Sequence, residues 1–181
     1  FNKFKKEILY RKKQIPHLSI EDIKFRFVRD RFLSKKKYED IMFKLINKKN
    51  FDYKKYYSRL FFSKEDIKQL DSLNHIIGLH THTHPTFLEN LTYDDQKLEY
   101  ERCINSVSQI LNKSNKLIKS MSHPTGSYSL ETLEILKKLR IEIGFKSTMQ
   151  IEKDKGMSKI NNTNLEIARE THPAIIRMMK K

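Results

Sequence analysis

From Ser63 onward, the sequence alternates between helical segments with clear start signals and short apolar segments. Helices are expected to begin after three capping residues, Ser63, Thr92 and Ser129. Apolar runs of strand length occur around residues 76–79, 117–122, 141–149 and 165–170. Helices of roughly 10 to 20 residues that alternate with short strands are typical of βα units and a mainly parallel sheet or barrel. The pattern therefore predicts an α/β fold, whose functional site lies at the carboxyl ends of the strands.

The apolar residues of these helices recur with helical spacing, and this spacing defines the faces expected to be buried. In the helix after Ser129, four leucines are expected to point inward: Leu130, Leu133, Leu136 and Leu139. The helix after Thr92 carries a longer stripe of Leu98, Tyr100, Cys103, Ile104, Val107, Ile110 and Leu111. Residues 34–50 predict a further amphipathic helix with Tyr38, Ile41, Met42, Leu45 and Ile46 on one face. Because Cys103 lies on an apolar stripe without a His or Cys partner nearby, we interpret it as a small buried residue rather than a reactive thiol.

The charge of the chain raises the question of nucleic acid binding. Its 37 basic and 22 acidic side chains give a net charge of +15, which is in the range where such binding has to be considered. However, 28 of the basic residues are Lys and only 9 are Arg, whereas recognition of bases and phosphates relies strongly on Arg. The Lys residues are also spread along the chain. Solvated surface is therefore the favoured interpretation, and a basic nucleic acid binder is the alternative.

Length and cysteine content narrow the class of protein further. A chain of 181 residues is long enough for one domain with a hydrophobic core, so a single domain over residues 1–181 is expected. No apolar run approaches the length of a membrane span and no signal peptide opens the sequence, so we expect a cytoplasmic protein. The single cysteine excludes an internal disulfide and fits a reducing compartment. The sequence begins with Phe1 rather than Met, so the natural start is expected to lie upstream.

Three of the seven histidines lie at alternate positions in the stretch GLHTHTHPTF, residues 78–87. Pro85 disfavours the αR conformation for His84, so His80 and His84 are expected on a loop just after a strand. Such a loop can bring two neutral imidazoles together as part of a Zn²⁺ site, which then needs a third ligand. A bound divalent metal lowers the pKa of water and polarises a carbonyl, as hydrolysis of an amide at neutral pH requires. We therefore predict a divalent metal, zinc in the first place, on His80 and His84, with His82 in a supporting role; plain core or surface histidines are the alternative.

Together with the later stretches SHPTGSYS and LKKLRIEIGF, the histidine run resembles the polysaccharide deacetylases of carbohydrate esterase family 4, the nodulation-type deacetylase homology domain. The second motif of that family is His-Ser/Thr-x-x-His followed by Pro. His80, Thr81, His84 and Pro85 match it, and in the family both histidines bind the metal. The resemblance thus implies a metal-dependent deacetylase that acts on N-acetylated sugars or polysaccharides.

The resemblance also implies roles for residues outside the histidine run. The third motif of the family is Arg-x-Pro-Tyr/Phe-Gly, which residues 122–126 match only at Pro and Gly. Thr125 would then donate its backbone N–H to the oxyanion hole, as the aromatic residue of that motif does. His172, in RETHPAII, is the candidate general acid, and a surface position for it is the equal alternative. Arg169 would either steady a carboxylate or cap the end of a strand.

Two departures from the family bear on activity. No Asp-Asp-Gly occurs in the sequence, although the first family motif supplies the catalytic base and the carboxylate ligand from such a pair. Asp94 and Asp95 are adjacent, but they are expected to cap a helix. Ser122 stands where the family has an Arg that steadies the base.

The departures shape what we expect of the whole chain. The resemblance covers residues 63–181 well and residues 1–62 loosely, so we expect an incomplete distorted (β/α)7 barrel in a chain that begins after the first strands. Little or no deacetylase activity is expected from the 181-residue chain alone. A non-catalytic relative that binds glycans or metal is the alternative in the same family.

Overall fold

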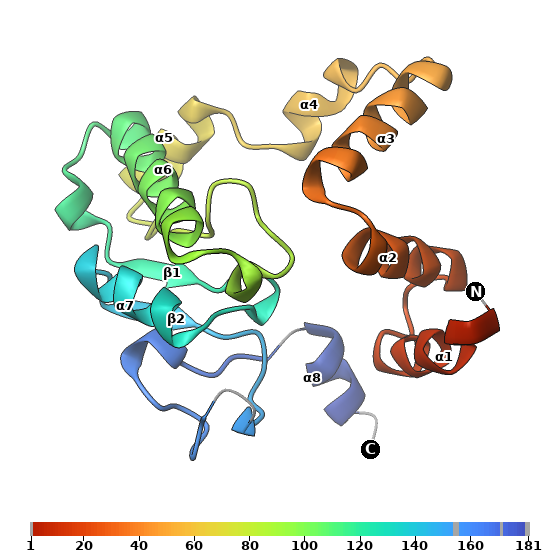
Figure 1. Ribbon diagram of the computed structural model, residues 1–181. Coiled ribbons are helices and arrows are strands. Elements are labelled where there is room, and N and C mark those ends of the chain that lie inside the picture. Colours follow the sequence, from red (N-terminus) through yellow and green to blue (C-terminus); the bar gives the residue numbers. More distant parts are fainter. Residues whose placement is uncertain (1, 154–155, 171, 180–181) are drawn as a thin grey trace. The chain divides into compact units, whose positions relative to one another are not determined.

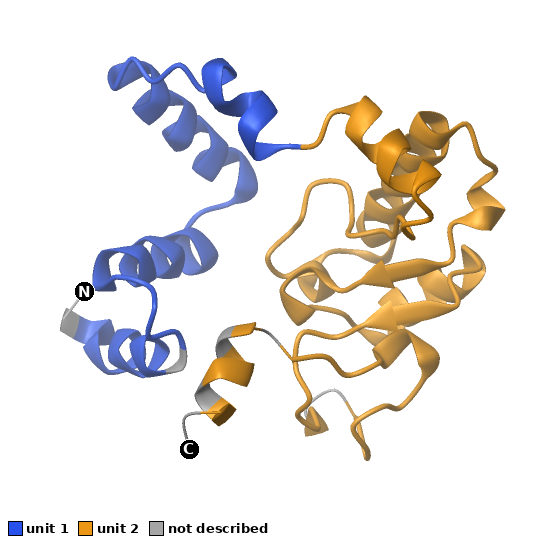
Figure 2. Ribbon diagram, turned by 180° about the vertical axis from the view of Figure 1, so that it is seen from behind, with its two compact units in different colours: residues 1–61 blue, residues 62–181 orange. Residues whose placement is uncertain are grey.

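The computed structural model describes residues 2–153, 156–170 and 172–179. The chain divides into two compact units, Phe1–Phe61 and Phe62–Lys181, which we call unit 1 and unit 2 (Figure 2). The boundary falls next to the position where the basic N-terminal part of the sequence gives way to the part that carries the motifs. The grouping of both units into a single domain stays a prediction.

Unit 1 is helical throughout its described residues. After a 3₁₀ turn at Asn2–Phe4, its helices are α1 (Lys5–Gln14), α2 (Ile20–Phe32), α3 (Lys35–Lys48) and α4 (Lys54–Leu60) (Figure 1). Ser19 and Ser34 begin α2 and α3, because the hydroxyl of each accepts a backbone N–H of the first turn. Helix α1 packs against α2, and the buried cluster of this unit consists of Ile8, Ile23 and Phe27. Helix α3 confirms the helix predicted for residues 34–50, but none of its residues is buried.

Unit 2 contains α5 (Lys64–Ser72), α6 (Tyr93–Leu111), α7 (Leu130–Lys138) and α8 (His172–Met179). The predicted capping residues Ser63, Thr92 and Ser129 begin α5, α6 and α7, each accepting a backbone N–H from three residues ahead. Short 3₁₀ turns lie at Leu88–Asn90, Asn115–Leu117, Pro124–Gly126 and Asn164–Glu166. Among the described residues, no helix has both the length and the apolar character that crossing a membrane requires.

The sheet of unit 2 is small and parallel. Strand β1 (Ser120–Ser122) pairs with β2 (Ile143–Phe145) in parallel register. Single parallel bridges extend the sheet on both sides, from Leu79 to Met121 and from Phe145 to Ile167. The parallel α/β arrangement is confirmed, but the strands expected at residues 76–79 and 165–170 shrink to these two bridges. The segment at residues 76–79 is short because only its end lies beside another strand. Leu79 exchanges hydrogen bonds with β1, whereas Ile76 is 85% exposed.

Two glycines let the segments of this sheet approach one another closely. A side chain at Gly144 would place its Cβ 2.5 Å from the carbonyl oxygen of Leu165, and one at Gly78 would lie 2.8 Å from the Ser120 hydroxyl. Both distances are shorter than non-bonded atoms tolerate. In a chain with only four glycines, these two answer a demand for space rather than for a special backbone angle.

The core of unit 2 lies between the sheet and its helices, with α6 packing on both α5 and α7. Its buried residues come from the bridges, the strands and helices α6 and α7, and include Leu79, Tyr100, Ile104, Met121, Leu133, Ile135 and Leu136. Two residues expected to point inward are exposed: Leu98 at 42% and Leu130 at 78%. The inward face of α6 consists of Gln96, Tyr100, Ile104 and Ser108. Leu98 comes two residues after Gln96 and therefore lies on the opposite side of the helix. Leu130 is the first residue of α7 and precedes the turn that meets the core.

Candidate functional site

The carboxyl ends of the parallel segments meet at one edge of the sheet. Leu79, Met121 and Gly144 lie in register, as do Ser122, Phe145 and Ile167 one residue further on. The chain leaves this edge at His80, His123, Lys146 and Ala168. Because parallel segments run in the same direction, the loops that follow them gather at that edge. The histidine loop therefore begins where the sequence predicted, directly after a strand-like segment.

His80 and His84 lie against each other in this loop. Their ring centroids are 4.8 Å apart and their planes are inclined by 67°. The Nδ1 atom of His80 is 2.7 Å from the carbonyl oxygen of Ser122 and 3.0 Å from its hydroxyl. Since a carbonyl oxygen can only accept, Nδ1 carries the proton and Nε2 of the neutral ring carries the lone pair. This is the arrangement in which a histidine binds a metal through Nε2 while its other nitrogen is held by the protein.

The environment of His80 favours its neutral form. Partial burial of the ring is the main cause that lowers the pKa of His80 below its ordinary value of 6.5. The hydrogen bond to Ser122 opposes this shift, whereas electrostatic interactions with His84 and Arg169 add to it. A neutral imidazole is the form that ligates a metal, so the electrostatics and the tautomer agree.

The conformation of the histidine loop is unusual and is held from outside. Thr81 and His84 have φ values of 62° and 52°, in the left-handed region that residues with a Cβ seldom occupy. Glu99, on α6, accepts hydrogen bonds from the backbone N–H groups of His82 and Thr83 at 3.0 and 2.7 Å and from the Thr83 hydroxyl at 2.6 Å. One carboxylate thus binds three donors of the loop between His80 and His84. His82 itself is exposed, and only its main chain takes part.

Sequence reasoning missed the contributions of Glu99 and of Ser122. Glu99 is only partly buried and is not among the buried residues of α6, so no local signal in the sequence pointed to it. Cys103 is partly buried, and this burial raises the pKa of its thiol, as expected for a packing residue.

The turn after β1 is tied to the histidine loop. Thr125 has a φ of 54° within the turn Pro124–Gly126, and its hydroxyl donates to the carbonyl oxygen of Thr86 at 2.7 Å. The adjacent His123 is buried; its Nε2 donates to the Leu165 carbonyl at 2.8 Å and its ring stacks on Tyr128. His123 is therefore part of the packed interior, whereas Thr125 is exposed beside the histidine loop.

The structure does not bring His172 to this edge by any described contact. His172 begins α8 and is exposed, and within the described residues no hydrogen bond or ion pair of its side chain is found. Arg169, in contrast, reaches the edge, where its Nε donates to the carbonyl oxygen of Lys146 at 3.0 Å. Of its two expected roles, capping the end of a strand is the one observed.

Among the described residues, His80 and His84 are the two candidate metal-binding side chains found together. Within residues 2–153, 156–170 and 172–179, no group of three His, Cys, Asp or Glu side chains is placed to hold a metal ion. Asp94 and Asp95 lie in the first turn of α6, where Asp95 accepts from the Thr92 hydroxyl, as the sequence predicted for capping residues. The two imidazoles fit a metal, and the carboxylate expected beside them is not supplied by the described residues.

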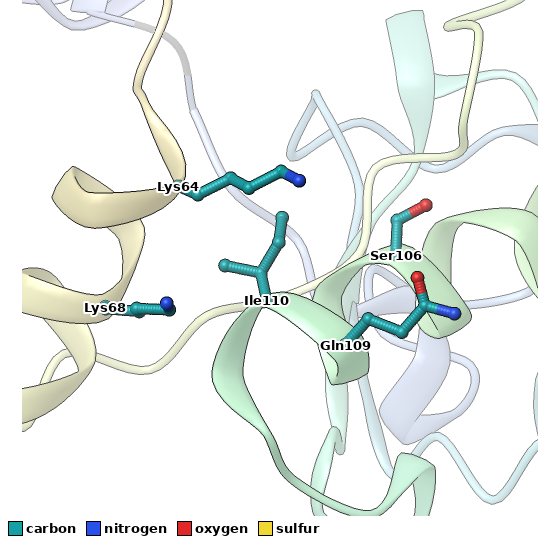
Figure 3. A pocket seen from close by; sticks show the side chains of 5 residues that line it. All are labelled: Lys64, Lys68, Ser106, Gln109 and Ile110. Carbon is teal, nitrogen blue, oxygen red and sulfur yellow. The ribbon is translucent and has the colours of Figure 1, made fainter.

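A pocket elsewhere in unit 2 is unrelated to this edge. Figure 3 shows it between α5 and α6, with a volume of about 330 Å³ and lined by Lys64, Lys68, Ser106, Gln109 and Ile110. None of the predicted site residues lines it. The candidate chemistry therefore lies in the loops at the sheet edge, not in this pocket.

A comparison with known protein families shows to which family the chain belongs. The profile described as polysaccharide deacetylase matches residues 31–144, which is more than half of the chain and includes the histidine loop. The chain belongs to the polysaccharide deacetylase family. This match confirms the resemblance found in the motifs. It also includes residues 31–61 of unit 1, where none of those motifs lies.

Several solved structures resemble this chain in fold. The deacetylase PplD of Streptococcus pyogenes, in complex with acetate, is 20% identical with a TM-score of 0.52, over 66% of this chain and 50% of that chain. IcaB from Ammonifex degensii is 19% identical with a TM-score of 0.49, over 65% and 52%. A CE4-family pseudoenzyme from Bacillus anthracis is 17% identical with a TM-score of 0.43, over 65% and 44%. This chain spans about half the length of these structures, and no curated protein matches it.

Proposed function

We propose that the chain is the part of a metal-dependent deacetylase of N-acetylated sugars or polysaccharides that carries the histidine ligands. The observation that carries the proposal is the pairing of His80 and His84, whose rings lie 4.8 Å apart. His80 is already set to use Nε2, because the Ser122 carbonyl holds its Nδ1. Zinc is the metal that best suits two imidazoles in a family of hydrolases.

In this proposal, a metal bound by His80 and His84 would lower the pKa of water and polarise the acetamide carbonyl. The protein contributes orientation. Glu99 keeps the loop in the conformation that pairs the two rings, and the turn that holds Thr125 is anchored to Thr86 in the same loop. The backbone N–H of Thr125 is assigned to the oxyanion of the tetrahedral intermediate. His172 is assigned the proton transfer to the departing amine, an assignment that the family resemblance supports.

The fold expected for this activity is an incomplete distorted (β/α)7 barrel. Four parallel segments in the spatial order Leu79, β1, β2 and Ile167 support a sheet of this kind, and helices α5, α6 and α7 alternate with them along the chain. The site then lies where barrels and open parallel sheets place theirs, at the carboxyl ends of the strands.

A second candidate is a relative that binds metal or glycan without catalysis. Two imidazoles without a neighbouring carboxylate favour it, because neither a third protein ligand nor a base is found in the described part of the chain. A second candidate that binds metal would use His80 and His84 as the first does, whereas one that binds only glycan would not need them. The first and second candidates differ in whether the 181 residues release acetate, and we expect little or no release.

The decisive experiment is a calorimetric titration of the 181-residue chain with Zn²⁺. We expect binding that is lost in His80→Ala and in His84→Ala but kept in His75→Ala, which removes an exposed histidine of the same unit. Equal binding by all four proteins, or none by the unmodified chain, would refute the metal site. Zinc-dependent release of acetate from an N-acetylated oligosaccharide would refute the expected inactivity and the second candidate together.

A further inference from the structure

Residues 35–61, which form α3, α4 and the segments around them, combine strong basic charge with exposed apolar side chains. This stretch contains eight Lys and one Arg against three acidic residues, a net charge of +6. Neither α3 nor α4 has a buried residue. Large apolar side chains in the stretch are at least 36% exposed at eight positions: Ile41, Phe43, Leu45, Phe51, Tyr53, Tyr57, Leu60 and Phe61. We call residues 35–61 the basic amphipathic surface.

Helix α3 orders these side chains into two faces. Its apolar residues follow the spacing i, i+3, i+4, i+7 and i+8, at Tyr38, Ile41, Met42, Leu45 and Ile46. Three lysines with the spacing i, i+7 and i+11 border one edge of this stripe: Lys37, Lys44 and Lys48. A stripe of this width normally packs into a core. Here it is exposed or half exposed along its whole length, so the other helices of unit 1 do not cover it.

We propose that the basic amphipathic surface docks on an anionic lipid bilayer. A helix with an apolar face and a lysine-rich polar face lies in the plane of the interface, with its apolar side chains at the boundary of headgroups and acyl chains. Clusters of four to eight basic residues on such a helix are typical of binding to acidic lipids. The aliphatic stems of lysines at the edge of the stripe extend towards the headgroups and keep their charges in water.

Two observations favour lipid over the other occupants. Lysine outnumbers arginine by eight to one in this stretch, and lysine is a mobile point charge that suits a layer of diffuse negative charge, whereas nucleic acid and carboxylate recognition use the fork of arginine. The exposed apolar side chains also continue beyond α3 through Phe51 and Tyr53 into Tyr57 and Phe61. They are spread over two helices and the segment between them, rather than forming one row that a single partner helix would fill.

The test uses the full 181-residue chain and sedimentation with vesicles of phosphatidylglycerol and phosphatidylcholine, or of phosphatidylcholine alone. We expect binding only to the vesicles that contain phosphatidylglycerol. Each lysine near such a surface strengthens binding about fivefold, so the triple variant Lys37→Gln, Lys44→Gln and Lys48→Gln should bind roughly 100-fold more weakly. The double variant Ile41→Gln and Leu45→Gln keeps the charge and should also weaken binding, because it removes apolar contact.

The matched control removes three exposed lysines of unit 2 that are far from residues 35–61 in the sequence, by Lys116→Gln, Lys137→Gln and Lys159→Gln, which changes the net charge equally. It should bind the acidic vesicles within about twofold of the unmodified chain, since only charges close to the surface contribute. Equal weakening in both triple variants, or equal binding to both vesicle types, would overturn the proposal. The proposal would also be overturned if the chain did not bind vesicles but bound duplex nucleic acid with a steep salt dependence. It would equally be overturned if the α3 variants converted a dimer into monomers without changing vesicle binding. Circular dichroism of each variant verifies that the helices are retained.

Discussion

Residues 1–61 and residues 62–181 divide the charge of the chain very unevenly. Unit 1 contains 19 basic and 7 acidic residues, a net charge of +12, and unit 2 contains 18 basic and 15 acidic residues, a net charge of +3. Over the described residues, the buried cluster of unit 1 has three members and that of unit 2 has twelve. Most of the net charge of +15 therefore lies in unit 1, whereas the family motifs lie in unit 2.

This difference changes how the basic composition is interpreted. Spread evenly, it would be ordinary solvated surface, as the sequence alone favoured. Concentrated on a unit with a thin core and many exposed aromatic side chains, it is typical of a surface that binds a polyanion or an acidic membrane. In unit 2 the charges largely balance, and polar side chains such as Glu99 are used to hold loops. The two units are therefore expected to respond differently to the same kind of substitution.

The largest expected difference concerns stability. Phe27 is fully buried in the three-residue cluster of unit 1, and replacing it by Ala should cost about 3–5 kcal/mol. The remaining contacts between α1 and α2 are mostly partly exposed ion pairs such as Arg31 with Glu7, which contribute little, so we expect this unit to unfold while unit 2 stays folded. Hydrogen exchange measured by mass spectrometry, peptide by peptide, would show the loss of protection confined to residues 1–61. Phe25→Ala is the matched control, because Phe25 lies on the same helix but is 45% exposed. Simultaneous loss of protection in α6 and α7 would contradict the independence of the two cores.

A smaller effect is expected at the histidine loop. Glu99→Ala removes the acceptor of three hydrogen bonds and should weaken zinc binding about 10- to 100-fold, as the loss of a group that orients metal ligands does. Glu99→Gln keeps one acceptor oxygen and should recover part of the affinity. Glu101→Ala, which breaks only a surface pair with Lys97, should leave the Kd unchanged. If all three variants bind zinc like the unmodified chain, the loop does not depend on Glu99, and the metal site itself would still stand.

Local signals in the sequence predicted the helices of unit 2 well. Ser63, Thr92 and Ser129 were identified as caps because a cap involves residues only three positions apart. Strand lengths were not predictable in the same way. Ile76 and Ile77 have the composition of a strand, but pairing depends on whether a partner lies alongside, and only Leu79 has one. The exposed Leu98 and Leu130 illustrate a related limit, because spacing identifies a stripe of residues but not the rotation of the helix on its core.

The candidate site shows the same division. His80 and His84 were identified from their own spacing, and their rings do lie together. Their supports come from far along the chain: Ser122 is 42 residues from His80, and Glu99 is 16 residues from Thr83. No local pattern encodes such contacts, because the partners are brought together only by the fold. The roles of Thr125 and His172 stay predictions from the family resemblance.

The smallest expected effect distinguishes the closed interior of unit 2 from the open surface of unit 1. Burial raises the pKa of the Cys103 thiol above its ordinary value of 9.0, so the folded protein contains less thiolate than the unfolded chain at any pH below that raised value. Alkylation requires the thiolate. Iodoacetamide should therefore modify Cys103 more slowly in the native protein than in denaturant, and the native rate should keep rising with pH beyond 9, where that of the unfolded chain levels off. Phe27→Ala, which unfolds unit 1 only, should leave the native rate unchanged, because Cys103 packs against the core of unit 2. A native rate equal to that in denaturant would show that α6 opens freely, and the contrast between the two cores would then fail at this position.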